Sequence, residues 1–115
     1  MTQRRLGDFE QLLLFSILRL SDDAYGVMIR QEIEERAGRF VSAGAVYTGL
    51  ERLEAKGLVS SRIGEATPGR GGRPRKYYRL ERSGAEALRS SYEELQRMAA
   101  GMSNRLAELA PEGGE

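Results

Sequence analysis

The sequence predicts a mainly α-helical protein with one small β-hairpin. Three observations support this prediction. Apolar residues recur with helical spacing in three stretches, residues 8–20, 23–37 and 43–57. Two short alternating stretches, separated by a loop rich in glycine and proline, follow between residues 58 and 81. A last stretch, residues 83–109, repeats apolar residues at intervals of four and three, as one long helix would.

The first helix, DFEQLLLFSILRL, is apolar on nearly every side. A surface helix would carry a single apolar stripe, so this one is expected to be buried on two sides, by its own core and by something else. The second helix is expected to start from the capping residues Ser21, Asp22 and Asp23 and to end at Gly38.

The third helix is expected to begin at Ser42 as its N-cap and to end at Gly57. One stripe of apolar residues, Val46, Leu50 and Leu53, should face the core. At about 100° per residue, the opposite face carries Gly44, Thr48, Glu51 and Ala55.

The hairpin that follows has strands LVSSRIG and KYYRLE. Tyr77 and Tyr78 must point to opposite faces of the second strand, so one belongs to the core and only the other can meet a ligand. The loop between the strands carries several arginines among glycines. Repulsion between like charges gives such a loop no stability, so an external polyanion is the favoured explanation; a solvated loop is the alternative.

The last helix is expected to open with a capping box at residues 83–86. Its 4-3 seam consists of Leu88, Tyr92, Leu95, Ala99, Met102, Leu106 and Leu109. Its first turns could pack on their own domain, but a stripe of about 30 Å exceeds a domain of about 80 residues, which favours contact between two molecules. The predicted organisation is therefore a domain at residues 1–82, a dimerisation helix at 83–110 and a disordered tail at 111–115.

Composition excludes several functions. The 115-residue chain has neither cysteine nor histidine, which removes disulfides, thiolate nucleophiles, Cys/His zinc sites and histidine acid–base chemistry. We therefore expect no enzyme and no cofactor or metal. The sequence contains no run of about 18 apolar residues, so no membrane span is predicted. Residues 41–80 carry eight basic and three acidic side chains, which gives a net charge of +5. The rest of the chain carries ten basic and fourteen acidic side chains, which gives a net charge of −4.

Three helices followed by a hairpin constitute a winged helix-turn-helix, a fold that binds double-stranded DNA. Small residues at the start of the third helix, Ala43, Gly44 and Thr48, would let its backbone approach the floor of the major groove. Arg70 and Arg73 in the loop suit a narrow, electronegative minor groove, and Gly72 lets the loop enter it.

The stretches AYGVMIRQEIEERAG, VSAGAVYTGLERLEAKGLVSSRIGE and GGRPRKYYRLERSG together resemble the PadR family of bacterial transcriptional regulators. The resemblance covers residues 6 to 109 and is closest to the short branch with a single helix after the hairpin. It implies a dimeric repressor joined through the C-terminal helix with help from the first helix, here Phe9 and Leu13. It also implies DNA contacts at Tyr25, Gly26, Ser42, Gly44, Tyr47, Thr48, Arg70, Arg73, Lys76 and Tyr78.

For Tyr25 and Tyr47, the alternative is a half-buried ring with a hydrated hydroxyl. Some members of the family hold planar aromatic effectors between subunits, against a tryptophan of the last helix. This chain has no tryptophan, and Leu95 stands near that position, which argues against a pore of that kind. An apolar effector cleft could still be lined by Phe15, Tyr92, Leu95, Met98 and Met102.

The sequence thus predicts a DNA-binding homodimer in the bacterial cytoplasm that represses transcription from an inverted-repeat operator and is relieved by a small apolar effector. The alternative is a winged-helix interaction module that binds RNA or a protein through its hairpin. Small residues on the third helix combined with the seam discriminate between the two, because an operator with two half-sites requires both features.

Overall fold

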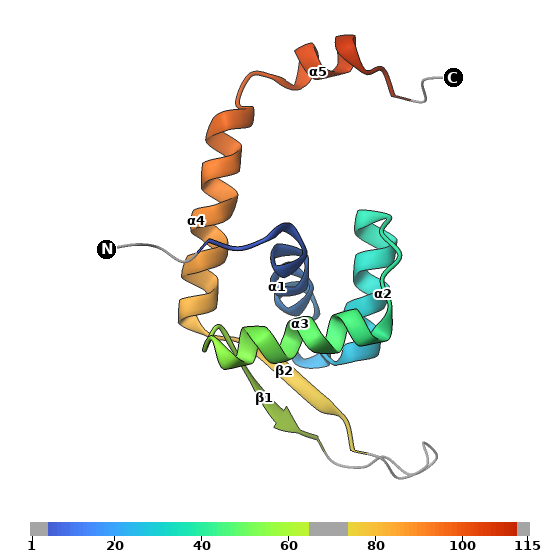
Figure 1. Cartoon of the computed structure of the whole chain (residues 1–115), viewed down its shortest axis with the longest axis vertical. Helices are drawn as coiled ribbons and strands as arrows, with labels where there is room; N and C mark the ends of the chain where they lie inside the picture. The colour runs from blue at the N-terminus through green and yellow to red at the C-terminus, as the bar shows by residue number, and fades with distance from the viewer. Residues whose placement is uncertain (1–4, 65–73, 113–115) are drawn as a thin grey trace.

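The computed structural model describes residues 5–64 and 74–112. It confirms the predicted fold class, helices with one antiparallel hairpin (Figure 1). In chain order the elements are α1 (Asp8–Leu20), a 3-10 turn (Ser21–Asp23), α2 (Gly26–Ala37), α3 (Ala43–Ala55), β1 (Val59–Ile63), β2 (Lys76–Leu80), α4 (Arg82–Ala99) and α5 (Ser103–Leu109). Within these ranges, no helix has both the length and the apolar character that crossing a membrane requires.

Helix α1 lies at the centre of the domain, with α2 and α4 on its two sides and α3 crossing below it in Figure 1. This position explains why α1 is apolar around most of its circumference. Its Leu13 and Leu14 are fully buried, together with Ile29 of α2 and Leu50 of α3. The expectation that Leu13 lies at a dimer interface is therefore wrong, because this side chain is buried in the core of its own chain.

The ends of α3 follow the sequence prediction. The Ser42 hydroxyl oxygen accepts a hydrogen bond from the Ala45 N–H at 3.1 Å, as an N-cap does. At the other end Gly57 has a φ of 77°, and the Leu58 N–H donates to the Leu53 carbonyl oxygen at 3.0 Å. This closing bond with a left-handed glycine is the Schellman ending, which satisfies otherwise unpaired helix carbonyls.

Helix α2 starts later than predicted, at Gly26 instead of residue 23. Residues 21–23 form a 3-10 turn, and the chain then becomes extended because it pairs with β2. The Tyr78 N–H donates to the Ala24 carbonyl oxygen at 2.8 Å, and Tyr25 forms a bridge with Tyr77. Pairing with a distant strand thus prevails over the local capping residues.

The hairpin pairs Val59 with Leu80 and Ile63 with Lys76 in an antiparallel register. Tyr78 lies on the face that packs on the core and is only 4% exposed. Burial, with a further contribution from the Glu54 carboxylate, raises the pKa of its hydroxyl. Tyr78 was predicted to contact DNA, and its burial contradicts that prediction.

The predicted capping box at residues 83–86 is not formed. Helix α4 starts at Arg82, and the Ser83 hydroxyl instead donates to the Gly57 carbonyl oxygen at 2.7 Å. Gly84 packs so closely on the residue before β1 that a Cβ there would lie 2.2 Å from the Leu58 carbonyl oxygen. These contacts anchor the base of α4 to the hairpin.

The continuous helix expected over residues 83–110 is wrong. Helix α4 ends at Ala99, Gly101 takes a left-handed φ of 77°, and α5 begins at Ser103. In Figure 1 α4 rises past α1, and α5 turns away from its far end. Gly101 allows this corner because it has no Cβ to oppose a positive φ.

The break divides the predicted seam into a buried start and an exposed remainder. Leu88 is 4% exposed and belongs to the core of its own domain, so its prediction as a dimer-interface residue is wrong. Further along, Leu95, Leu106 and Leu109 are between 61% and 75% exposed. The alternative of packing within one chain thus holds for the first turns of α4 alone.

Candidate nucleic-acid interface

Helix α3 presents a face of small side chains to solvent. Its buried stripe, Val46, Leu50 and Leu53, is at most 1% exposed. On the opposite side Ala43, Gly44 and Thr48 are exposed, as the sequence predicted. A Cβ on Gly44 would have only the Ser42 hydroxyl oxygen nearby, at 4.0 Å, so this part of the helix backbone is open to an approaching molecule.

Tyr47 projects from α3 over the first turn of α2. The two elements approach so closely that a Cβ at Gly26 would lie 2.5 Å from the Tyr47 hydroxyl oxygen. The glycine is thus required to keep this ring in place. Gly26 and Tyr47 are distant in the sequence, and only the packing of α2 on α3 brings them into contact.

A cavity of about 350 Å³ opens between these two helices and the hairpin. Its lining consists of Tyr25, Gly26, Val27, Tyr47, Pro74, Arg75 and Lys76. The first turn of α2 contains no acidic residue and leaves N–H groups without acceptors in the helix. The helix dipole and two cationic side chains therefore make this cavity favourable for an anion such as a DNA phosphate.

Lys76 lies at the rim of this cavity, at the open end of β2. Its ammonium nitrogen is 3.7 Å from a Glu54 carboxylate oxygen and 5.8 Å from the Tyr78 ring centre. Such a partly exposed pair is weak and can be exchanged for a phosphate at little cost.

Arg75 was not among the residues that the sequence singled out. Its guanidinium carbon lies 4.1 Å from the centre of the Tyr25 ring, within the same cavity. The alternation of β2 could have indicated it, because residues 75 and 77 share one face of an extended strand. Tyr77 then contacts Tyr25 edge to face, with ring centres 5.4 Å apart.

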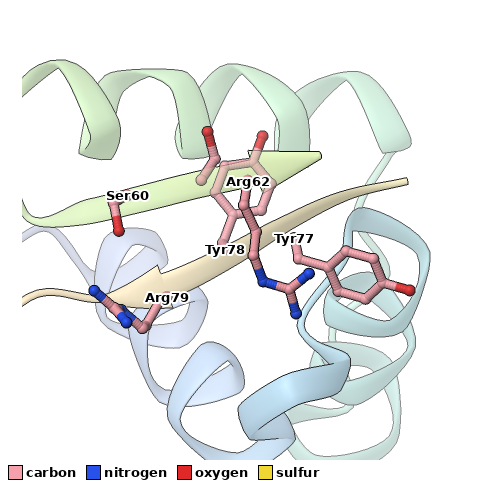
Figure 2. A pocket seen from close by; sticks show the side chains of 6 residues that line it. Ser60, Arg62, Tyr77, Tyr78 and Arg79 are labelled. Atoms are coloured by element: carbon pink, nitrogen blue, oxygen red, sulfur yellow. The ribbon is translucent and has the colours of Figure 1, made fainter. Parts of the chain in front are cut away.

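The hairpin face opposite Tyr78 carries Ser60, Arg62, Tyr77 and Arg79 around a hollow of about 220 Å³ (Figure 2). In Figure 2 the Arg62 side chain extends toward the Tyr77 ring, and its guanidinium carbon lies 4.6 Å from the ring centre. Arg79 extends separately and forms a long ion pair with Glu81 at 3.8 Å. The sequence left open which tyrosine is buried; Tyr77 is the half-exposed one.

Three of the predicted DNA-contacting residues, Arg70, Gly72 and Arg73, lie outside the described residues. Over the described ranges, the acidic side chains form no group of three that could hold a metal ion.

The second candidate surface is apolar and lies around the base of α4. Phe15 and Tyr92 meet edge to face with ring centres 6.0 Å apart. They line a hollow of about 210 Å³ together with Leu18, Leu80, Ala85, Leu88 and Arg89. Leu95, Met98 and Met102, which were predicted to complete an effector cleft with these two rings, do not line it.

Comparison with known proteins identifies the fold and its family. The model of the transcriptional regulator PadR-like family matches residues 14–90, about two thirds of the chain. The chain belongs to the PadR-like family. The family consists of regulators of transcription and not of enzymes, and DNA is its partner.

Solved PadR structures resemble the larger part of this chain. A PadR family regulator from Clostridium difficile R20291 is 31% identical with a TM-score of 0.67, over 85% of this chain and 98% of that one. A PadR-like transcription factor from Bacteroides fragilis is 33% identical with a TM-score of 0.61, over 79% and 85% of the two chains. A PadR family regulator from Eggerthella lenta is 28% identical with a TM-score of 0.63, over 84% and 81%. Among curated protein sequences, no significant match is found.

Proposed function

We propose that this PadR-like regulator is a sequence-specific repressor that binds an inverted-repeat operator as a homodimer. The observation that supports sequence-specific binding most strongly is the open backbone at Gly44 beside the cationic cavity of Tyr25, Tyr47 and Arg75. A helix that enters the major groove needs close backbone approach at its start, and flanking groups that bind phosphate fix its register.

The residues divide into two roles under this proposal. Thr48, on the exposed face of α3, reads base edges, because its side chain points away from the Val46 stripe. Tyr25, Tyr47 and the first turn of α2 bind backbone phosphates, together with Lys76. Ser42 and Ala43 open the same helix, where the N-terminal end of the dipole favours phosphate. Arg70, Gly72 and Arg73 extend the contact into a flanking minor groove.

A homodimer is supported by the apolar surface of the C-terminal helices. Six large apolar side chains on α4, α5 and the corner between them are 45% to 77% exposed: Tyr92, Leu95, Met98, Met102, Leu106 and Leu109. Ala99 is also exposed there. Monomeric proteins rarely expose large apolar side chains on this scale, so a second copy that covers them is the proposed partner. Phe9 of α1, also predicted at the interface, lies on another side of the domain, beside Gly49 of α3 and the Arg39 guanidinium.

Repression is proposed to be relieved by a small apolar effector in the bacterial cytoplasm. The supporting observation is the apolar hollow between Phe15 and Tyr92, which adjoins the exposed surface of α4. A ligand there would affect the angle between the two DNA-binding domains, because α4 is attached to the hairpin through Gly84.

The test is selection of bound duplexes from a random DNA library with the unmodified protein. We expect enrichment of an inverted repeat whose half-site centres lie about 10 base pairs, or a multiple of that, apart. A variant with Leu95→Glu and Leu106→Glu serves as the control and should enrich no such repeat. Enrichment of single half-sites by the unmodified protein would contradict the dimer, and preference for single-stranded RNA would favour an RNA-binding module instead.

A further inference from the structure

Four side chains near the loop end of the hairpin form a continuous stack. Arg62 lies over the Tyr77 ring at 4.6 Å, Tyr77 meets Tyr25 edge to face at 5.4 Å, and Arg75 lies over the Tyr25 ring at 4.1 Å. The stack runs from the outer face of the hairpin to the cavity at the start of α2. Its inner end, Tyr25 and Arg75, lines the proposed phosphate site; its outer end does not.

We propose that Tyr77 and Arg62 are positioning residues for DNA binding, which hold Tyr25 and Arg75 in the orientation that neutralises a phosphate. The proposal rests on the proposed function of the cavity. It assigns a role in DNA binding to two residues that touch no DNA themselves, and it joins the hairpin to the first turn of α2 as one rigid unit.

The backbone explains why these four side chains meet. Tyr25 and Tyr77 face each other across an antiparallel bridge, beside the hydrogen bond from the Tyr78 N–H to the Ala24 carbonyl oxygen. Arg62 is the cross-strand partner of Tyr77 in the hairpin register. Tyr77 therefore stands in the middle of three neighbouring backbone segments, where its ring contacts Arg62 on one side and Tyr25 on the other.

The charges explain why the stack is suited to binding and not only to packing. Across residues 5–64 and 74–112, no carboxylate oxygen lies within ion-pair distance of the Arg62 or Arg75 guanidinium, whereas Arg79 on the same hairpin face has Glu81. An arginine stacked by its flat face on an aromatic ring keeps its N–H edge available for an anion. The stack thus fixes the direction of Arg75 and, among the described residues, leaves its guanidinium without a carboxylate partner.

The salt dependence of DNA binding distinguishes positioning from general stabilisation. Each phosphate neutralised contributes about 0.9 to the slope of log K against log salt concentration. If Tyr77 positions Arg75, the uncharged replacement Tyr77→Leu should lower this slope by about 0.9, the same change that is expected of Arg75→Ala. Leucine keeps the apolar bulk against Tyr25 and removes only the aromatic face, which limits damage to the fold.

The experiment measures affinity for the duplex recovered by selection, by fluorescence anisotropy at four or more salt concentrations. We expect Tyr77→Leu to weaken binding about five- to tenfold, because two contacts with an aromatic ring are lost. Tyr77→Phe should restore both the affinity and the slope, since stacking needs the ring and not the hydroxyl. In the Arg75→Ala background, Tyr77→Leu should cost less than about twofold, because the two residues act on the same phosphate contact.

Arg62→Ala and Arg79→Ala form a matched pair on one hairpin face. Removal of the stacked Arg62 should weaken binding several-fold, whereas removal of Arg79, which lies outside the stack, should change it less than about twofold. Thermal unfolding of each variant verifies that it is folded at the assay temperature. Additive effects of Tyr77→Leu and Arg75→Ala, or an unchanged salt slope in Tyr77→Leu, would overturn the positioning role while DNA binding stands. Failure of the unmodified protein to bind any duplex would overturn the proposed function itself.

Discussion

Gly44→Ala should make the protein more stable and at the same time weaken its binding to DNA. In the free protein the added methyl meets nothing closer than the Ser42 hydroxyl oxygen at 4.0 Å. Alanine in place of an exposed helical glycine stabilises by about 0.5–1 kcal/mol, and the first-turn position of Gly44 places the gain at the lower end. That gain corresponds to a rise in unfolding temperature of about 2–4 °C.

On DNA the same methyl would occupy space that the proposed helix–groove contact requires. Insertion of a methyl group into a packed contact costs about 1–3 kcal/mol, which is about 5- to 150-fold in affinity. Circular dichroism gives the unfolding temperature, and anisotropy with the selected duplex gives the affinity. A variant that is more stable and binds equally tightly would refute the assignment of this face of α3 to the DNA.

Gly49→Ala provides the matched control on the same helix. Gly49 faces the core, and a Cβ there would lie 2.5 Å from a Leu13 methyl carbon. The substitution should therefore lower the free energy of unfolding by about 1–3 kcal/mol, opposite in sign to Gly44→Ala. Because both variants replace a helical glycine by alanine, the difference between their stabilities reports the space around each glycine and not its helix propensity.

Three further predictions concern stability and assembly. Gly84→Ala should lower the free energy of unfolding in urea by at least about 1–3 kcal/mol, because the new Cβ would lie 2.2 Å from a backbone carbonyl oxygen that cannot move freely. For Glu10, burial is the largest single influence and raises the pKa of the carboxyl. The hydrogen bonds from Lys56 and the Gly7 N–H, together with the charges of Lys56 and Arg52, outweigh it, so the net result is a lowered pKa. The ion pair therefore contributes stability above the unfolded pKa of 4.5, and this stability is lost as the pH falls through the lower folded value. Lys56→Met should accordingly flatten the decline of the unfolding temperature below pH 4.5. An unchanged decline would contradict this assignment. Leu95→Glu with Leu106→Glu should yield monomers by light scattering, and an unmodified protein that is monomeric at micromolar concentration would contradict the dimer.

Local sequence signals predicted the parts of the fold that local forces determine. The Ser42 cap, the left-handed Gly57 and the buried stripe of α3 each depend on residues a few positions apart, and all three are confirmed. The fold class followed from the order of such elements, whereas the family followed from the resemblance of three stretches of the sequence to its members. The exposed small face of α3 was predicted for the same reason, because helix periodicity fixes which residues lie opposite the stripe.

The features that the sequence did not reveal depend on contacts between distant segments. The pairing of Tyr25 with Tyr77 delays the start of α2 and creates the stack, and no local pattern around residue 25 indicates it. The choice between Tyr77 and Tyr78 required knowing which face of the hairpin meets α3. The apolar spacing from Leu88 onward continues across Gly101, so periodicity alone could not place the corner between α4 and α5.

The most direct test of the central claim, a dimer that presents two α3 helices to one face of DNA, is insertion of base pairs between the half-sites of the selected operator. Five inserted base pairs rotate one half-site by about half a turn, so that a rigid dimer can engage only one of them. The account predicts that tight binding is lost after the five-pair insertion and partly restored after ten. Affinity that is retained after the five-pair insertion would mean that the subunits bind independently, and would contradict the account.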